Sequence, residues 1–154
     1  GDGFTIAMKG LDGGRLNIAA CSLGGASAAF EMAQRYVGER QQFGQPLAAF
    51  QAVQFRLADM ATTLEAARTL LYRAASALDR GDPDATKLCA MAKRFVTDAC
   101  SGVANDALQL HGGYGYLKDY GVERIVRDLR VHQILEGAND IMRVIIAREL
   151  GRGI

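Results

Sequence analysis

The chain has 154 residues, of which 49% are hydrophobic and 23% charged, a balance that indicates one soluble globular domain with a core of its own. Its 18 lysine and arginine residues almost cancel its 17 acidic residues, so the net charge of +1 gives no electrostatic case for a nucleic-acid partner. No run of about 18 apolar residues and no signal peptide is visible, so neither a membrane span nor secretion is expected.

The predicted elements are almost all helical. Residues 1 to 9 are the one place for a strand, since Phe4, Ile6 and Met8 alternate with other residues. From residue 16 to 37, apolar residues recur at steps of three and four, which predicts a one-sided helix. The chain opens without an initiator methionine, as a fragment or a processed chain would.

The same periodicity predicts two longer helices, from 50 to 78 and from 88 to 110. Pro46 suits the first turn of the second helix, and Asp82, directly before a proline, is placed to cap the third.

The C-terminal part of the chain completes an all-α prediction. A shorter helix is expected near 121 to 130, and a last helix from about 139 to 150, with Asn139 or Asp140 as its cap. The fold class is therefore an up-down helical bundle of four main helices plus a short extra helix.

The cysteines and histidines indicate no metal centre. Cys21, Cys89 and Cys100 lie in alanine-rich apolar runs without CxxC spacing, so we expect buried, reduced thiols in a reducing compartment. His111 and His132 are far apart and belong to no ligand cluster, so no metal site is predicted.

Two segments could contact a phosphorylated ligand. Gly112, Gly113 and Gly115 do not spell GxGxxG and follow no strand, so they are either a helix C-cap and tight turn or a backbone that a ligand can approach closely. Arg40 comes at a predicted helix end, where a cation is stabilised in any case. Phe43, in the loop beside it, also suits an interface or a phosphate-bearing aromatic ligand.

Glu136 is the candidate for acid–base chemistry. A glutamate directly before a glycine is usually solvated in a loop or placed at a helix N-terminus. Here Ile134 and Leu135 precede it, which favours burial. A carboxyl group desolvated by apolar neighbours has a pKa raised toward neutrality, as a general base requires. Alone, this residue does not identify an enzyme.

Taken together, the segments resemble the C-terminal domain of the acyl-CoA dehydrogenase family, in the family's order and across essentially the whole chain. Within the family, the isobutyryl-CoA dehydrogenase branch looks most similar, with other short-chain enzymes as the near alternative. The matching blocks are GDGFTIAMKGLDGGRLNIAA, YVGERQQFGQPLAAFQAVQFRLADM, QLHGGYGYLKDY and RDLRVHQILEGANDIMRVIIAREL.

This resemblance implies a domain organisation and partners. Residues 1–10 would end a linker from a missing β domain, and residues 11–154 would form the C-terminal helical bundle domain. FAD and the acyl-CoA substrate bind between these two domains in the family, and its members are usually homotetramers that share FAD between subunits. The implied electron acceptor is an electron-transfer flavoprotein, and the compartment is the bacterial cytoplasm or the mitochondrial matrix, with no nucleic-acid or membrane partner.

The resemblance also assigns the residues around the substrate. Glu136 matches the family's base, which removes the α-proton of the thioester while hydride leaves the β-carbon for the flavin. Some relatives place the base on the first helix, at the position of Gly14, which has no side chain here. Asp12 and Arg15 match a stretch near the thioester and the base, and Arg148 matches a CoA contact.

For the cofactor, Arg40 matches an arginine that reaches the FAD of another subunit, with Phe43 beside it. The residue two after the base is usually Thr or Ser but is Ala138 here, so a hydroxyl contact worth about 1 kcal/mol is missing. The full set of positions that match FAD contacts is Arg40, Phe43, Phe50, Gln51, Gln109, Gly112, Gly113, Ala138, Asn139 and Asp140.

The predicted function is therefore α,β-dehydrogenation of a short or branched acyl-CoA, with isobutyryl-CoA as the expected substrate, FAD as cofactor and Glu136 as base. The alternative is that the isolated chain is an inactive helical oligomerisation module, because the missing β domain supplies most flavin-ring contacts in the family. A stand-alone four-helix binding protein is disfavoured, since Glu136, Arg15, Arg40 and Gln109 are all retained.

Overall fold

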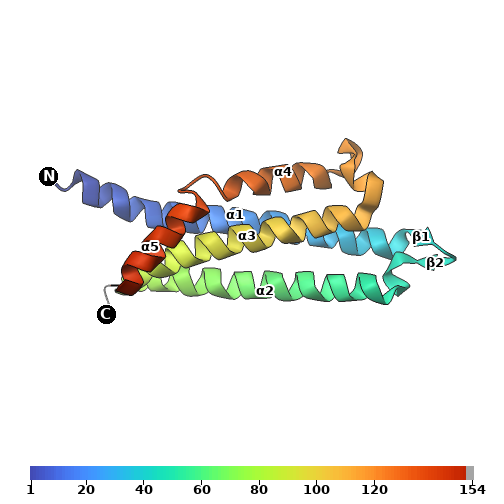
Figure 1. The fold of residues 1–154 in the computed structure, drawn as a ribbon, viewed down its shortest axis with the longest axis horizontal. Helices are drawn as coiled ribbons and strands as arrows, with labels where there is room; N and C mark the ends of the chain where they lie inside the picture. The colour runs from blue at the N-terminus through green and yellow to red at the C-terminus, as the bar shows by residue number, and fades with distance from the viewer. Residues whose placement is uncertain (152–154) are drawn as a thin grey trace.

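The computed structural model describes residues 1–151, without the side chains of Phe4, Thr5 and Lys9. Three long helices pack side by side, α1 (Gly3–Glu39), α2 (Gln51–Arg80) and α3 (Ala85–His111), and successive helices run in opposite directions (Figure 1). The predicted all-α, up-down bundle is confirmed.

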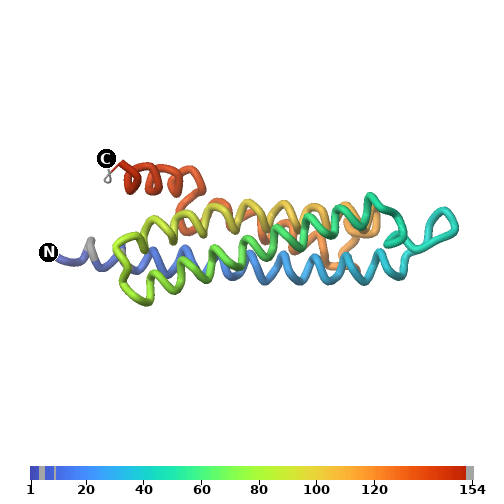
Figure 2. Tube along the Cα trace, turned by 90° about the horizontal axis from the view of Figure 1, so that it is seen from below, coloured from blue at the N-terminus to red at the C-terminus, as the bar shows by residue number. Residues whose placement is uncertain are grey.

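Two short 3₁₀ helices, η2 (Gly112–Tyr116) and η3 (Lys118–Tyr120), and two shorter α-helices follow α3. The helix α4 (Val122–His132) takes the fourth place in the bundle, packed along α1 and α3. The last helix, α5 (Asn139–Gly151), packs against α3 and crosses one end of the bundle (Figure 1). Turned by 90°, the molecule shows α5 on the α3 side and the first turns of α1 projecting beyond the other helices (Figure 2). The connection between α4 and α5 therefore lies at the surface of that end.

The strand predicted for residues 1 to 9 is wrong. The helix α1 begins at Gly3, and the Ile6 amide donates to the Asp2 carbonyl at 3.0 Å. An alternating pattern forms a strand only if another strand supplies the hydrogen-bond partners. No strand lies beside these residues in the described chain, so the backbone satisfies its own groups as a helix.

A small hairpin joins α1 to α2. Strands β1 (Gln41–Gln42) and β2 (Gln45–Pro46) pair antiparallel around Phe43 and Gly44, which both have positive φ, at 54° and 78°. Two positive φ angles in a two-residue connection match the twist of a hairpin. Pro46 therefore ends the hairpin and precedes the short 3₁₀ helix η1 (Leu47–Ala49), so its predicted place in the first turn of the second helix is wrong.

The predicted N-cap of the third helix is also wrong. Gly81, at a φ of 67°, closes α2 in the left-handed conformation, and α3 starts at Ala85 after Asp84. The Asp82 carboxylate instead accepts a hydrogen bond from the Arg80 guanidinium at 2.7 Å. A charged partner two residues away thus takes the oxygen that would have capped the helix.

Small side chains fill the seams between the helices. Two of the three thiols belong to this core: burial raises the pKa of Cys89 to about 11 and that of Cys100 to about 12. Cys21 is exposed, so the prediction that all three are buried is wrong for that residue. Ten alanines have no exposed surface: Ala19, Ala26, Ala29, Ala33, Ala67, Ala74, Ala90, Ala92, Ala104 and Ala107.

Candidate functional site

The predicted site residues gather at two opposite ends of the bundle (Figure 1). One end holds the Glu136 loop, which we define as residues 133–138 between α4 and α5. The other, the hairpin end, comprises residues 40–51 and 109–116. Along α3, Lys93 contacts the Glu136 loop and His111 lies at the hairpin end. These 18 residues of helix correspond to about 27 Å, so the two groups do not meet within one chain.

The Glu136 loop has an unusual backbone. Glu136 has a φ of 56° and Gly137 a φ of 89°, and a positive φ is uncommon for any residue with a side chain. The Asn139 amide donates to the Gln133 carbonyl at 3.0 Å and closes the loop on itself. Such a conformation persists only where its surroundings hold it.

The loop places the Glu136 carboxylate directly over Gly14 of α1. A Cβ atom built on Gly14 would lie 2.5 Å from Glu136 Oε2 and 3.1 Å from its Cδ. No real side chain tolerates the shorter distance, so this carboxylate position requires glycine at residue 14. A side chain at residue 14 and the Glu136 carboxylate would therefore occupy the same volume.

The expected burial of Glu136 does not occur within this chain, where the residue is exposed. The apolar neighbours that suggested burial do not cover it, since Ile134 is 55% exposed and Leu135 is only half-buried. Because α5 crosses the end of the bundle, the loop remains on the outside. The described residues therefore leave this side chain open to solvent.

A buried polar cluster flanks Gly14, with Asp12 and Arg15 on α1 and Thr86 on α3. Arg15 Nη1 donates to Asp12 Oδ1 at 2.6 Å, and the Thr86 hydroxyl donates to Asp12 Oδ2 at 2.7 Å. Asp12 and Arg15 are only 6% and 7% exposed. The buried Nε of Arg15 has no partner in the described part of the chain. The predicted substrate pair thus lies beside Gly14.

The residues after the loop have different surroundings. Asn139 is buried and its side-chain amide bonds to α3, which leaves little of it for a ligand. Asp140 and Arg148 are exposed, and Asp140 accepts a hydrogen bond from Arg143 at 2.9 Å. The Ala138 carbonyl accepts hydrogen bonds from the amides of Ile141 and Met142. Ala138 is therefore the residue that caps α5, and the prediction of Asn139 or Asp140 as the cap is wrong.

The hairpin end combines an arginine with exposed rings. The Arg40 guanidinium lies 5.3 Å from the centre of the Tyr114 ring and forms no salt bridge with the described residues. Phe43 is 91% exposed and meets Phe50 edge to face at 6.1 Å. Gln51 beside this pair is exposed.

The glycine turn completes this end. Gly112, at a φ of 60°, follows α3, and its amide donates to the Gln109 carbonyl, so the interpretation as a helix C-cap is confirmed. Gln109, Gly112 and Gly113 are exposed. Gly115 is buried, and a Cβ there would lie 2.7 Å from the Leu108 carbonyl oxygen. The turn is therefore a tight structural corner with an open outer face.

Sequence reasoning missed two polar contacts near the Glu136 loop. Lys93 has no exposed surface although it is charged, and it follows the buried Cys89 by one helical turn. That spacing, a lysine on a face that should be buried, was the available signal. The Ser22 hydroxyl also lies 2.8 Å from His132 Nδ1, and burial lowers the pKa of His132.

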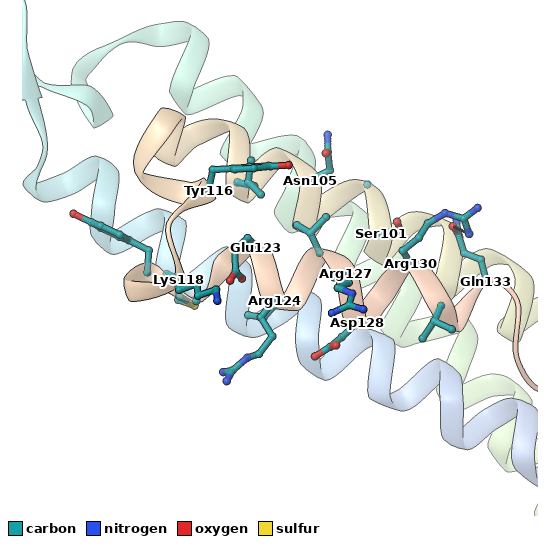
Figure 3. A pocket seen from close by; sticks show the side chains of 18 of the residues that line it. Ser101, Asn105, Tyr116, Lys118, Glu123, Arg124, Arg127, Asp128, Arg130 and Gln133 are labelled. Carbon is teal, nitrogen blue, oxygen red and sulfur yellow. Dashed lines mark hydrogen bonds between the residues drawn. The ribbon is translucent and has the colours of Figure 1, made fainter.

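A hollow of about 1540 Å³ opens between α3 and α4, lined by residues such as Ser101, Asn105, Tyr116 and Arg127 (Figure 3). None of the residues predicted to contact FAD or substrate lines it, so we do not assign it as the ligand site. Within residues 1–151, no group of three His, Cys, Asp or Glu side chains could hold a metal ion. No helix in the same part of the chain has an apolar stretch long enough to cross a bilayer.

Fold and geometry together define a helical-bundle domain with a surface glutamate loop at one end and a cation beside aromatic rings at the other. The family described as acyl-CoA dehydrogenase, C-terminal domain, matches residues 1–151, and the chain belongs to this family.

Individual relatives agree with this membership. Mitochondrial isobutyryl-CoA dehydrogenase of Bos taurus is 58% identical over 97% of this chain and 36% of its own length. The structure of butyryl-CoA dehydrogenase from Megasphaera elsdenii is 45% identical, with a TM-score of 0.93 over 97% of this chain and 39% of that one. The structure of PigA with FAD and proline is 34% identical, with a TM-score of 0.87 over 92% of this chain and 37% of that one. The chain thus spans little more than a third of the proteins it resembles.

Proposed function

We propose that this chain is the C-terminal helical domain of an FAD-dependent acyl-CoA dehydrogenase in which Glu136 is the base. The observation that carries the proposal is the Glu136 carboxylate held over Gly14 by a positive-φ loop. Residues 1–10 would end the linker from a β domain, and residues 11–154 would form the bundle domain. Isobutyryl-CoA is the proposed substrate, because the bovine enzyme of that name is 58% identical.

The chemistry proposed for the loop is proton removal next to a thioester. A Glu136 oxygen accepts the α-proton, and the electron pair of the broken C–H bond moves toward the thioester carbonyl. Within the described chain, the amides of Glu136, Gly137 and Ala138 donate to no protein group. The Glu136 amide is the proposed donor to the developing oxyanion, because an oriented N–H stabilises charge as it forms. When bound, FAD accepts the hydride that leaves the β-carbon, which gives the 2-enoyl-CoA.

The hairpin end suits FAD. Arg40 has no counter-ion among the described residues, which leaves its guanidinium for the pyrophosphate. The exposed ring of Phe43 fits a flat ring system. Arg40, Phe43, Phe50 and the turn at Gly112 are therefore the proposed contacts. Because this end lies about 27 Å along α3 from the Glu136 loop, we assign it to the FAD of a neighbouring subunit in a homotetramer.

At the other end, the backbone of Ala138–Asp140 is the proposed contact to the subunit's own FAD. Asp12 and Arg15 flank the thioester, and Arg148 contacts CoA. An electron-transfer flavoprotein is the proposed acceptor, in a mitochondrial matrix or a bacterial cytoplasm.

A substrate panel on the complete flavin-loaded protein tests this function. Mixed without oxygen, isobutyryl-CoA should bleach the visible flavin absorption faster than butyryl- or 2-methylbutyryl-CoA, because it is the proposed substrate. Fastest bleaching by another of the three would overturn the substrate assignment alone. No bleaching by any short acyl-CoA would overturn the proposed dehydrogenase activity.

A separate candidate function, favoured by the distance between the two ends, is that the chain alone is an inactive assembly module. We expect the isolated 154-residue chain to elute from gel filtration as an oligomer without flavin colour, since most of the residues proposed to contact FAD are exposed in the described chain. Absorption spectra of the eluted peak after incubation with FAD provide the measurement. A stoichiometric flavin band would show that the chain is sufficient for cofactor binding.

A further inference from the structure

A lysine is buried where α3 passes the Glu136 loop. Lys93 has no exposed surface, and its Nζ donates to the Gly137 carbonyl at 2.7 Å and to Asn139 Oδ1 at 2.7 Å. Burying an ammonium group is costly unless it is paired and hydrogen-bonded. Both of its recorded acceptors belong to the loop or to the residue that follows it. The buried ammonium group of α3 is therefore used to bind the loop that bears the proposed base.

The neighbouring side chains of α3 secure the two ends of the same loop. Asp98 Oδ1 accepts from Gln133 Nε2 at 2.8 Å and from Asn139 Nδ2 at 2.7 Å. The Thr97 hydroxyl accepts a second bond from Asn139 Nδ2 at 2.9 Å. Among the described contacts, only the bond from Lys93 to the Gly137 carbonyl reaches the interior of the loop from α3. The Gly137 carbonyl belongs to the residue directly after Glu136, whose carboxylate lies over Gly14.

The charges that face Lys93 come from three elements. Burial lowers the pKa of Lys93, and Asp98 on its own helix raises it. Arg15 of α1 lowers that pKa, and Glu136 of the loop raises it. The ammonium and the Glu136 carboxylate are thus close enough to influence each other, although they are not hydrogen-bonded.

We propose that Lys93 is the positioning residue for the base: its bond to the Gly137 carbonyl fixes the positive-φ backbone that directs the Glu136 carboxylate onto Gly14. The inference rests on the proposed function of Glu136. A positive φ at a glutamate is an unfavourable backbone conformation that persists only where contacts hold it, and the bond from Lys93 is such a contact. A carboxylate displaced by about 1 Å would lose about 10²-fold in rate.

Lys93→Met in the complete flavin-loaded protein tests this role, because methionine keeps the unbranched shape and removes the charge and the donors. We expect kcat to fall about 10- to 100-fold with KM within about threefold and flavin content unchanged. Lys87→Met, on the same helix and paired with Asp84 alone among the described residues, is the matched control and should retain kcat. Lys93→Arg, which keeps charge and donors, should recover part of the lost kcat.

Proton removal can be read directly with an acyl-CoA analogue that has sulfur at the β position and cannot lose hydride. Exchange of its α-hydrogens with deuterated water should slow in Lys93→Met by the same factor as kcat. If that variant does not fold, Thr97→Val loosens the same loop through Asn139 and should lower the exchange rate about threefold to tenfold.

The outcomes separate this inference from the function on which it rests. A Lys93→Met protein that melts earlier but keeps kcat and α-hydrogen exchange well below its melting temperature has lost only stability, and the positioning role fails. If Glu136→Gln abolishes exchange while Lys93→Met does not change it, the positioning role alone fails. If Glu136→Gln retains exchange, the base assignment itself is wrong.

Discussion

Glu136→Gln is expected to lower turnover of the complete enzyme by about 10²- to 10⁴-fold, the usual contribution of a general base. The amide has nearly the shape of the carboxyl group but does not accept the α-proton. In the described chain the Glu136 side chain forms no hydrogen bond or salt bridge and is exposed. The melting temperature and the flavin content should therefore remain at the parent's values. Steady-state turnover, flavin absorption and a thermal melt on the same preparation measure all three.

The control for this variant is Glu65→Gln, which removes a carboxylate from the surface of α2, where it pairs with Arg68. It should keep full turnover. Turnover of Glu136→Gln above roughly one per cent of the parent's would contradict the assignment, because a base worth less than 10²-fold is not the group that removes the proton.

Gly14→Ala is expected to separate stability from activity. In the interior of α1, alanine should be favoured over glycine by about 1 kcal/mol, so the fold gains rather than loses stability. The added Cβ, however, would lie 2.5 Å from Glu136 Oε2. That oxygen ends a flexible side chain, so the carboxylate moves aside instead of the helix. Displacement by about 1 Å corresponds to a loss of about 10²-fold in kcat.

The matched control is Gly24→Ala in the same helix, where a Cβ would meet nothing within 4 Å. It should show the same gain in melting temperature with unchanged kcat. If Gly14→Ala also keeps full kcat, the carboxylate does not act from the position over Gly14. If it instead destabilises the protein, the clash is resolved by the backbone and not by the Glu136 side chain.

Apolar periodicity was sufficient to predict the bundle, because each long helix must bury one stripe and the stripes repeat every three to four residues. Element ends were less predictable. Asp82 has the preferred chemistry of an N-cap, yet Arg80 competes for its carboxylate. The alternation of residues 1 to 9 says nothing about whether another strand lies beside them.

In the candidate site, too, some features could be predicted from the sequence and others could not. The resemblance of its segment predicted Glu136 as the base, and that role stays a prediction. The positive φ of Glu136 was not predicted, because that conformation is set by contacts outside the segment. The bond from Lys93 to the Gly137 carbonyl joins residues 44 positions apart in the chain. A sequence shows that a lysine stands on a buried helical face, but not which carbonyl it meets.

The ten fully buried alanines lower the conformational entropy that this domain loses on folding. An alanine side chain has no rotamers to lose, so ordering these seams costs almost no side-chain entropy. Close backbone packing then leaves the long helices few alternative arrangements. The bundle therefore acts as a stiff frame, and the bonds from α3 to Gln133 and Asn139 attach both ends of the Glu136 loop to that frame.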